Sequence, residues 1–295
     1  MTASPRPRVS TGRVLTYLVL LLAAALFLVP LVAMIFTSLK TMPEITGAPG
    51  FEDSTIFSPP RLISFEAWGL AWSSACIAVA CEGLRIYFWN SVLLVVFAVS
   101  FSVGLGAING YVLSKWRFRG DNIIFGMLLF GCFIPFQIVL IPMARVLGIL
   151  ELANSLGGLI LVHVCYGIPF TTLFFRNFYV TVPDELVAAG RIDGAGFWQI
   201  FAIILLPISW PTLVVAVIWQ FTSVWNDFLF GATFSGPDTR PLMVALNNLV
   251  NTSTGTKAYN VDMAGAMIAA LPTMLVYIVG GRYFLRGLTS GAVKG

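Results

Sequence analysis

The sequence predicts an all-α integral membrane protein with six transmembrane helices. Of its 295 residues, 58% are hydrophobic and only 10% are charged, and the mean hydropathy is +0.90. A soluble domain carries about 25% charged residues, so this chain cannot cover a water-exposed surface. The net charge of +4 is small and the basic residues are scattered near the ends of apolar runs, which gives no indication of nucleic-acid binding.

Six stretches are long enough to cross a bilayer, which takes about 20 mostly apolar residues. The first follows a basic N-terminus, but it is longer than a signal-peptide core and lacks a small-residue cleavage site, so we expect an uncleaved helix. Prolines within several stretches predict kinks, which neighbouring membrane helices can accommodate. The expected spans are 14–37, 88–113, 123–143, 156–175, 203–222 and 263–284.

The distribution of Lys and Arg predicts the orientation. With the N-terminus inside, 11 of the 17 basic residues are cytoplasmic, and the short loop KWRFRGD carries three of them. Cytoplasmic loops are enriched in Lys and Arg. We therefore expect a multi-pass protein of a bacterial-type inner membrane with both ends in the cytoplasm. Its parts would be an N-terminus at 1–13, one membrane domain at 14–287 with long external loops at 38–87 and 230–262, and a tail at 288–295.

The four cysteines predict no metal site, because they lack paired CxxC spacing. Cys76 and Cys81 lie five residues apart in the first external loop, where the surroundings are oxidising. They either form a local disulfide or remain two free thiols. Cys132 and Cys165 lie within helices and are expected to be packing residues.

Catalysis by this chain is not expected. No phosphate-binding loop of the form GxxxxGK[ST] is present, so no cofactor is expected on this chain. The lone histidine, His163, lies in the middle of the fourth span. It is either a proton relay, as intramembrane ionisable groups often are, or a neutral imidazole bonded to a neighbouring helix. The second interpretation is favoured because no carboxylate lies in the apolar cores.

The stretch at 181–202 interrupts the apolar sequence and predicts a short amphipathic helix along the membrane surface. Pro183 suits the first turn of a helix, and acidic residues follow at its positive end. Asp193 and Gly194 would close the helix with a turn. A face suited to close docking would hold Leu186, Ala189 and Gly190. The alternative is an ordinary surface helix that covers one end of the bundle.

The residue order of this stretch, Pro-x-Glu-Leu-x-x-Ala-x-Arg-Ile-Asp-Gly-Ala and then Leu-Leu-Pro, closely resembles the EAA loop of ABC-importer permeases. The RGLTxGAVKG ending is typical of their carbohydrate-uptake branch, and VALNNLVNTSTG with YNVDMA looks most like glucose/mannose permeases. Ala188 stands where the family usually has Glu, so Glu185 is the nearest carboxylate that could substitute. By this resemblance, the residues expected to couple to an ATPase are Pro183, Glu185, Leu186, Ala189, Arg191, Ile192, Asp193, Gly194, Ala195 and Pro207.

The resemblance implies a type I ABC importer permease fold and a transport subunit, not an enzyme. The implied partners are a second homologous permease in a heterodimer, two copies of an ATPase subunit that hold ATP and Mg, an external sugar-binding protein, and lipid. Glucose or mannose is the expected substrate. Alternatives are an oligosaccharide or a polyol phosphate within the same family, or a different class, an ion-coupled secondary transporter, which would need intramembrane carboxylates and inverted repeats.

The end of the fifth span supplies the chemistry of a sugar site, which needs amide or carboxyl groups for hydroxyls and an aromatic face for the ring. Gln220 and Asp227 lie seven residues apart and therefore share a helix face. The alternative is an interfacial belt, because Trp and polar residues gather at the ends of membrane helices. The candidates are Gln220, Ser223, Trp225, Asn226 and Asp227, with Gln137 from the third span.

Overall fold

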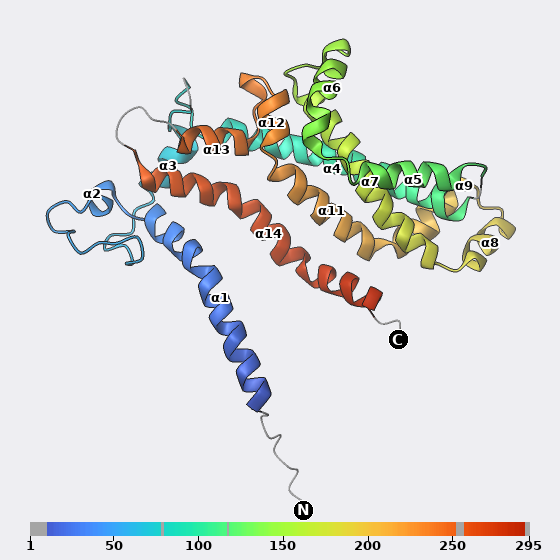
Figure 1. Cartoon of the computed structure of the whole chain (residues 1–295), viewed down its shortest axis with the longest axis horizontal. Helices are drawn as coiled ribbons and strands as arrows, with labels where there is room; N and C mark the ends of the chain where they lie inside the picture. The colour runs from blue at the N-terminus through green and yellow to red at the C-terminus, as the bar shows by residue number, and fades with distance from the viewer. Residues whose placement is uncertain (1–10, 78–79, 117, 252–256, 293–295) are drawn as a thin grey trace, which may run out of the picture.

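Long helices dominate the computed structural model, which describes residues 11–77, 80–116, 118–251 and 257–292, with side chains from residue 12 to 281. The longest are α1 (Thr11–Ser38), α4 (Arg85–Lys115), α7 (Leu156–Thr181) and α14 (Tyr259–Ala292) (Figure 1). Four of the described helices are long and apolar enough to cross a membrane, or six spans result if each of two bent pairs counts as one. The all-α fold with six spans is confirmed in this sense. Most of the predicted N-terminal segment and the last residues of the RGLTxGAVKG tail lie outside the described residues.

The centre of the fold is the contact between α4 and α7, which small residues make possible. A Cβ on Gly106 would lie 2.3 Å from Thr171 Oγ1, and a Cβ on Gly110 would lie 2.6 Å from Phe175 Cβ. The Thr171 hydroxyl donates to the carbonyl of Ser102 at 2.7 Å. Membrane helices associate through such close backbone approach and interhelical hydrogen bonds. Two glycines one turn apart therefore set the spacing of this pair.

The third span is broken more sharply than predicted. We expected one kinked helix at 123–143, but α5 (Asp121–Gly131) and α6 (Phe136–Ile149) meet at 105°. Pro135 has extended backbone at the start of α6, and a proline also disfavours helical backbone in the residue before it. The freed carbonyl of Ile134 accepts a hydrogen bond from the Tyr166 hydroxyl at 2.9 Å. The break is thus stabilised by α7.

The fifth span bends where its two prolines predict. It runs through α9 (Phe197–Gln199), a π-helical turn η1 (Ile200–Leu205) and α10 (Leu206–Ile208), and then turns by 80° into α11 (Trp210–Trp225). Ser209 lies at the bend between Pro207 and Pro211. Its hydroxyl donates to the Leu206 carbonyl at 2.9 Å and lies 3.2 Å from the Tyr179 hydroxyl of α7. The predicted bend is confirmed.

Short helices fill the segments between the spans. The first long loop, at 38–87, contains α2 (Met42–Ile45) and α3 (Glu66–Ser73). The segment 230–262, predicted as a long external loop, is partly helical. It forms α12 (Leu229–Phe234), a 3-10 turn η2 (Pro237–Thr239) and α13 (Leu242–Val250). The reason is an apolar face at helical spacing, because α13 buries Leu242, Ala245 and Leu249.

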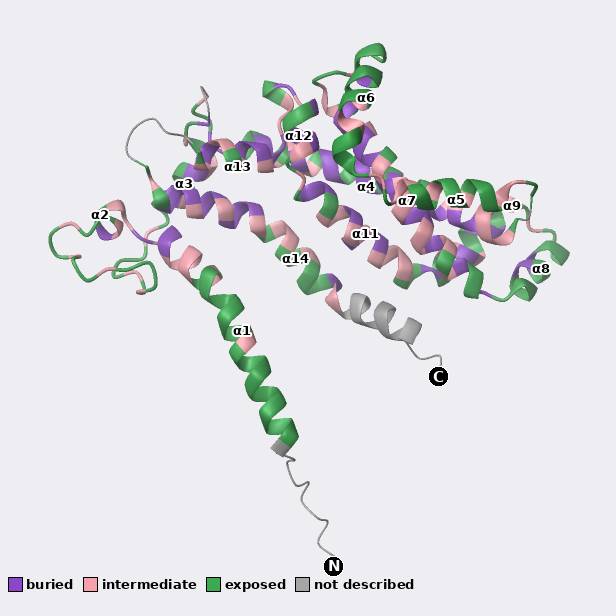
Figure 2. Cartoon of the chain, viewed as in Figure 1, coloured by how far each residue is buried: buried purple, intermediate pink, exposed green. Residues whose placement is uncertain are grey.

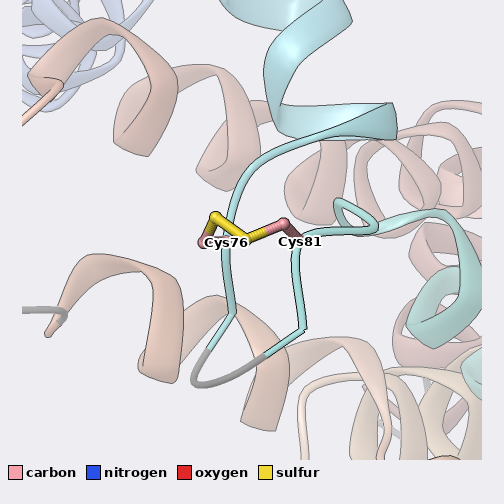
Figure 3. The surroundings of a disulfide bond; sticks show 2 residues. All are labelled: Cys76 and Cys81. Atoms are coloured by element: carbon pink, nitrogen blue, oxygen red, sulfur yellow. A yellow bond between two sulfur atoms is a disulfide. The ribbon is translucent and has the colours of Figure 1, made fainter.

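Cys76 and Cys81 are joined in a disulfide, the first of the two states left open by the sequence (Figure 3). Paired backbone bonds between Ile77 and Ala80 lie just inside it. The disulfide therefore lies in the segment immediately before α4. Cys132 is half-buried, but Cys165 is exposed and not the packing residue that was expected.

Helix α1 lies apart from the bundle for most of its length. Its membrane-spanning stretch has no buried residue, whereas half of the corresponding stretch is buried in α4 and in α7. Figure 2 shows this contrast, with α1 exposed and α4 and α7 rich in buried residues. Its apolar surface is suited to lipid or to another membrane helix.

Candidate functional site

The predicted docking helix is α8 (Asp184–Ile192), which follows Pro183 and carries two carboxylates in its first turn. Gly194 has φ +83°, the left-handed backbone that glycine adopts without strain. The Gly194 amide donates to the Arg191 carbonyl, and the Ala195 amide donates to the Gly190 carbonyl at 2.9 Å. This pair of bonds is a Schellman motif, which satisfies the last carbonyls of a helix. The predicted helix and its closing turn are therefore present.

The two faces of α8 differ from the predicted arrangement at one residue. Val187 and Gly190 are buried against the bundle, while Leu186 and Ala189 are exposed. Gly190 was assigned to the docking face, but a Cβ there would lie 2.8 Å from Ile204 Cδ1 of η1. Gly190 is thus the position where α8 approaches the fifth span. The outward face holds Glu185, Leu186, Ala188, Ala189 and Ile192, the last 86% exposed.

Two basic residues tether α8 to the bundle. Lys115 Nζ, at the end of α4, lies 2.6 Å from Asp184 Oδ1 and 2.5 Å from the Val182 carbonyl oxygen. The Arg191 guanidinium lies 4.8 Å from the centre of the Trp116 ring, a cation–π contact. Sequence reasoning used Lys115 only as a marker of orientation. The pairing spans 69 residues, and no spacing rule within a single helix could reveal it.

Pro207 and Ala195 connect this helix to the bend of the fifth span. Ala195 and Phe197 pack against the main apolar core, and the Phe197 ring lies 4.8 Å from that of Tyr111 on α4. The turn after α8 is therefore anchored to α4 as well as to η1.

A polar cavity of about 360 Å³ lies between the break of the third span, α7 and α11. Three of the predicted sugar-site residues line it, namely Gln220, Ser223 and Asp227. The seven-residue spacing of Gln220 and Asp227 does place both on one side of the fifth span. His163 and Tyr166 of α7 complete the polar lining.

The structure does not bring the other candidates to this cavity. Trp225 is buried on another side of α11, where its Nε1 donates to the Ala269 carbonyl at 2.9 Å. Asn226 and Gln137 are exposed, and neither lines the cavity.

His163 has a carboxylate neighbour that sequence reasoning missed. Its Nε2 lies 3.6 Å from Asp227 Oδ2, a carboxylate from outside the predicted apolar spans. The two residues are 64 positions apart, and Asp227 follows the last turn of α11. Two backbone amides, of Phe230 and Gly231, also point to the Asp227 carboxylate. Within the described residues, His163 Nε2 makes no hydrogen bond.

Helices long and apolar enough to span a membrane, with an anchored amphipathic helix between the fourth and fifth spans, define an integral membrane protein. The chain belongs to the family of binding-protein-dependent transport system inner membrane components, which it matches over residues 102–285. That region includes α8 and the polar cavity.

Relatives of similar length align with nearly the whole chain. A probable ABC transporter permease of Pyrococcus horikoshii is 40% identical over 98% of this chain and 99% of its own. The xylose/arabinose import permease XacI of Haloferax volcanii is 32% identical over 96% and 94%. The diacetylchitobiose uptake permease NgcG of Streptomyces coelicolor is 30% identical over 95% and 88%.

Solved structures show the same fold. A chain of a bacterial ABC transporter involved in the import of alginate superposes with a TM-score of 0.78 at 20% identity, over 95% of this chain and 100% of that one. A chain of the inward-facing MetNI methionine ABC transporter gives 0.53 at 20% identity, over 66% and 91%. The fold is that of a type I ABC importer permease.

Proposed function

We propose that this chain is the permease subunit of an ATP-driven sugar importer and forms half of its translocation pathway. Membership of the permease family supports this, as do relatives named for the import of xylose and arabinose, diacetylchitobiose, or arabinooligosaccharides. A second homologous permease would complete the pathway, and an external binding protein would deliver the sugar. Family membership favours this function over an ion-coupled secondary transporter.

The observation that carries the proposal is the construction of α8. Its inward face packs against η1 at Gly190, and Lys115 binds Asp184 at its first turn. The Schellman motif caps its last turn. The outward face, with Leu186, Ala189 and the highly exposed Ile192, is left for a partner. A rigid helix with an apolar outer face suits a cleft in a separate ATPase subunit. ATP and Mg would be bound there and not by this chain.

The membrane orientation is part of the same proposal. Docking to an ATPase requires α8 to lie in the cytoplasm, which agrees with the excess of Lys and Arg on that side. Both termini would then be cytoplasmic, in a bacterial-type inner membrane. The Cys76–Cys81 disulfide would face the oxidising outside, where such bonds persist.

Glucose or mannose is the proposed substrate, supported by the likeness of the 244–264 sequence to permeases for those sugars. The relatives above are named for pentoses and oligosaccharides, which are therefore the alternatives.

The test is uptake by the complete transporter in proteoliposomes with ATP and its binding protein. Labelled glucose, mannose, xylose, maltose and maltotriose would be compared. ATP-dependent accumulation of glucose or mannose is expected. Accumulation of xylose or maltose alone would overturn the choice of sugar, and accumulation of none of them would contradict the sugar-importer function.

A further inference from the structure

Two buried side-chain atoms at the polar cavity make no hydrogen bond within the described part of the chain. His163 is 4% exposed and Gln220 is 2% exposed, and both line the cavity. Within the described residues, His163 Nε2 and Gln220 Oε1 make no hydrogen bond. Burying a polar atom without a hydrogen bond costs the free energy of removing it from water. Two such atoms at one cavity indicate a place where another molecule supplies the missing hydrogen bonds.

Backbone geometry holds Gln220 in this position. A Cβ on Gly167 would lie 2.3 Å from Gln220 Nε2, so only glycine leaves room for the amide against α7. The Gln220 amide nitrogen donates to the His163 carbonyl at 3.3 Å. With the nitrogen used in this way, the oxygen is left as an acceptor at the cavity.

Aromatic rings form the rest of the wall. Trp219 and Phe170 pack with ring centres 4.4 Å apart. Phe230 lies 5.2 Å from the Tyr166 ring and 5.5 Å from the His163 ring. The donors and acceptors thus face a space bordered by apolar ring surfaces, the combination that suits a molecule with hydroxyl groups around an apolar ring face.

The size of the cavity limits the ligand. At about 360 Å³ it is near the lower end of the roughly 300–1,000 Å³ of small-molecule sites. One sugar ring suits this space better than a chain of rings. The lining comes from this chain alone: from the break of the third span, α7 and α11, and from Asp227 and Phe230 beyond α11.

We propose that this cavity is a binding site for a single sugar ring, in which His163 Nε2, Gln220 Oε1 and the Asp227 carboxylate meet its hydroxyl groups. The proposal rests on the proposed import of sugar and adds where in this subunit the sugar stops, which atoms hold it and how large it is. The rival occupant is water alone, which would also satisfy the polar atoms.

A native cysteine provides the readout. Cys132 lines the cavity and is half-buried, while Cys165 is exposed on α7 and does not line it. The rates at which N-ethylmaleimide modifies both thiols would be measured by peptide mass spectrometry. The sample is the complete transporter in nanodiscs, turning over with its binding protein and ATP, so that every state of the cycle is sampled. Glucose, mannose, xylose and maltotriose are the probes.

A transported monosaccharide should slow the modification of Cys132 and leave Cys165 unchanged. In His163→Leu and in Gln220→Leu, the sugar concentration that gives half-protection should rise roughly five- to tenfold, as expected for the loss of one hydrogen bond. Gly167→Ala keeps both polar atoms but displaces the amide, and should weaken protection in the same direction. It tests the site even if His163→Leu does not assemble.

Thr273→Val is the matched control. The Thr273 hydroxyl is another buried atom without a partner in the described part of the chain, on α14 and outside the cavity lining. This variant should protect Cys132 as the native protein does. Equal loss of protection in Thr273→Val would overturn the assignment, because the effect would then be general to the bundle.

The remaining outcomes separate the site from the function. If the preparation transports a monosaccharide but no sugar protects Cys132, the cavity holds water and the site is wrong, while the importer function stands. Equal protection by maltotriose would refute the one-ring limit. Unchanged protection in all three cavity variants would refute the residue assignment. If none of the probes is transported, the proposed function fails and the site fails with it.

Discussion

Lys115 Nζ lies 2.6 Å from Asp184 Oδ1, so the last residue of α4 holds the first residue of α8. The Lys115 side chain is only 3% exposed, whereas that of Asp184 is 82% exposed. The ammonium group is therefore fixed by the bundle, and it also binds the Val182 carbonyl. The start of α8 is thus joined to α4, which packs closely on α7.

Replacing Lys115 with Met should loosen this connection. Because Asp184 is largely exposed, the cost in stability is about 1 kcal/mol, and the transporter should still assemble. The ATPase rate should respond less to the loaded binding protein, and uptake per ATP hydrolysed should fall several-fold. Both are measured on the reconstituted transporter.

Asp184→Asn is the control for this change, because Lys115 keeps its bond to the Val182 carbonyl. It should lose much less coupling than Lys115→Met. Native coupling in Lys115→Met would contradict the tether.

The glycines of α4 give a prediction on stability. A valine at Gly106 would meet both the side chain and the backbone of Thr171, at 2.3 to 2.8 Å from its Cβ. Overpacking of this kind costs about 1–3 kcal/mol or more. Gly106→Val should therefore lower the thermal unfolding temperature of the detergent-solubilised protein and its yield in the membrane.

Gly104→Ala provides a matched control on the same helix, since nothing lies within 4 Å of a Cβ there. It should unfold at the native temperature. If Gly106→Val is as stable as Gly104→Ala, the α4–α7 contact does not depend on close backbone approach.

The disulfide predicts a simple pattern of thiol reactivity. Under denaturing, non-reducing conditions, iodoacetamide should label Cys132 and Cys165 only, and reduction should expose Cys76 and Cys81. Closing so short a loop restricts the unfolded chain by an amount worth about 2 kcal/mol in the chain-entropy description. Cys76→Ser should therefore destabilise the protein modestly and leave Cys81 reactive. Labelling of all four cysteines before reduction would show that the bond does not form in the membrane protein.

The sequence predicts those features of the structure that depend on residues close together in the chain, and it fails where contacts between distant residues decide. The spans and the closing turn of α8 follow from apolar length and from Asp193-Gly194, which act locally. The 105° break near Pro135 was underestimated, because a proline interrupts a helix without fixing the angle that follows. Helix α13 was missed because polar residues between its apolar positions were taken for a loop.

The residues of the polar cavity were predicted only in part, because some of them are brought together by packing between distant helices. Gln220 and Asp227 share a helix face by spacing alone, and the structure places both at one cavity. The approach of His163 to Asp227, 64 residues away, depends on how α7 packs beside α11 and has no local signal. Gly167 and Gly190 likewise lie where a side chain from another helix leaves little room for a Cβ, and this is visible only in the packed structure.

The last prediction concerns Gly194, whose φ of +83° makes the turn that ends α8. A valine there has open space around its Cβ, so its cost is backbone strain of about 1–3 kcal/mol. The Schellman bonds from Gly194 and Ala195 would weaken and the outward face of α8 would tilt. Gly194→Val should therefore separate ATP hydrolysis from uptake in a complex that still assembles, seen as ATPase activity that no longer responds to sugar. Gly194→Asn should retain coupling, because asparagine tolerates left-handed backbone. Native sugar-stimulated ATPase activity in Gly194→Val would refute the role of this turn.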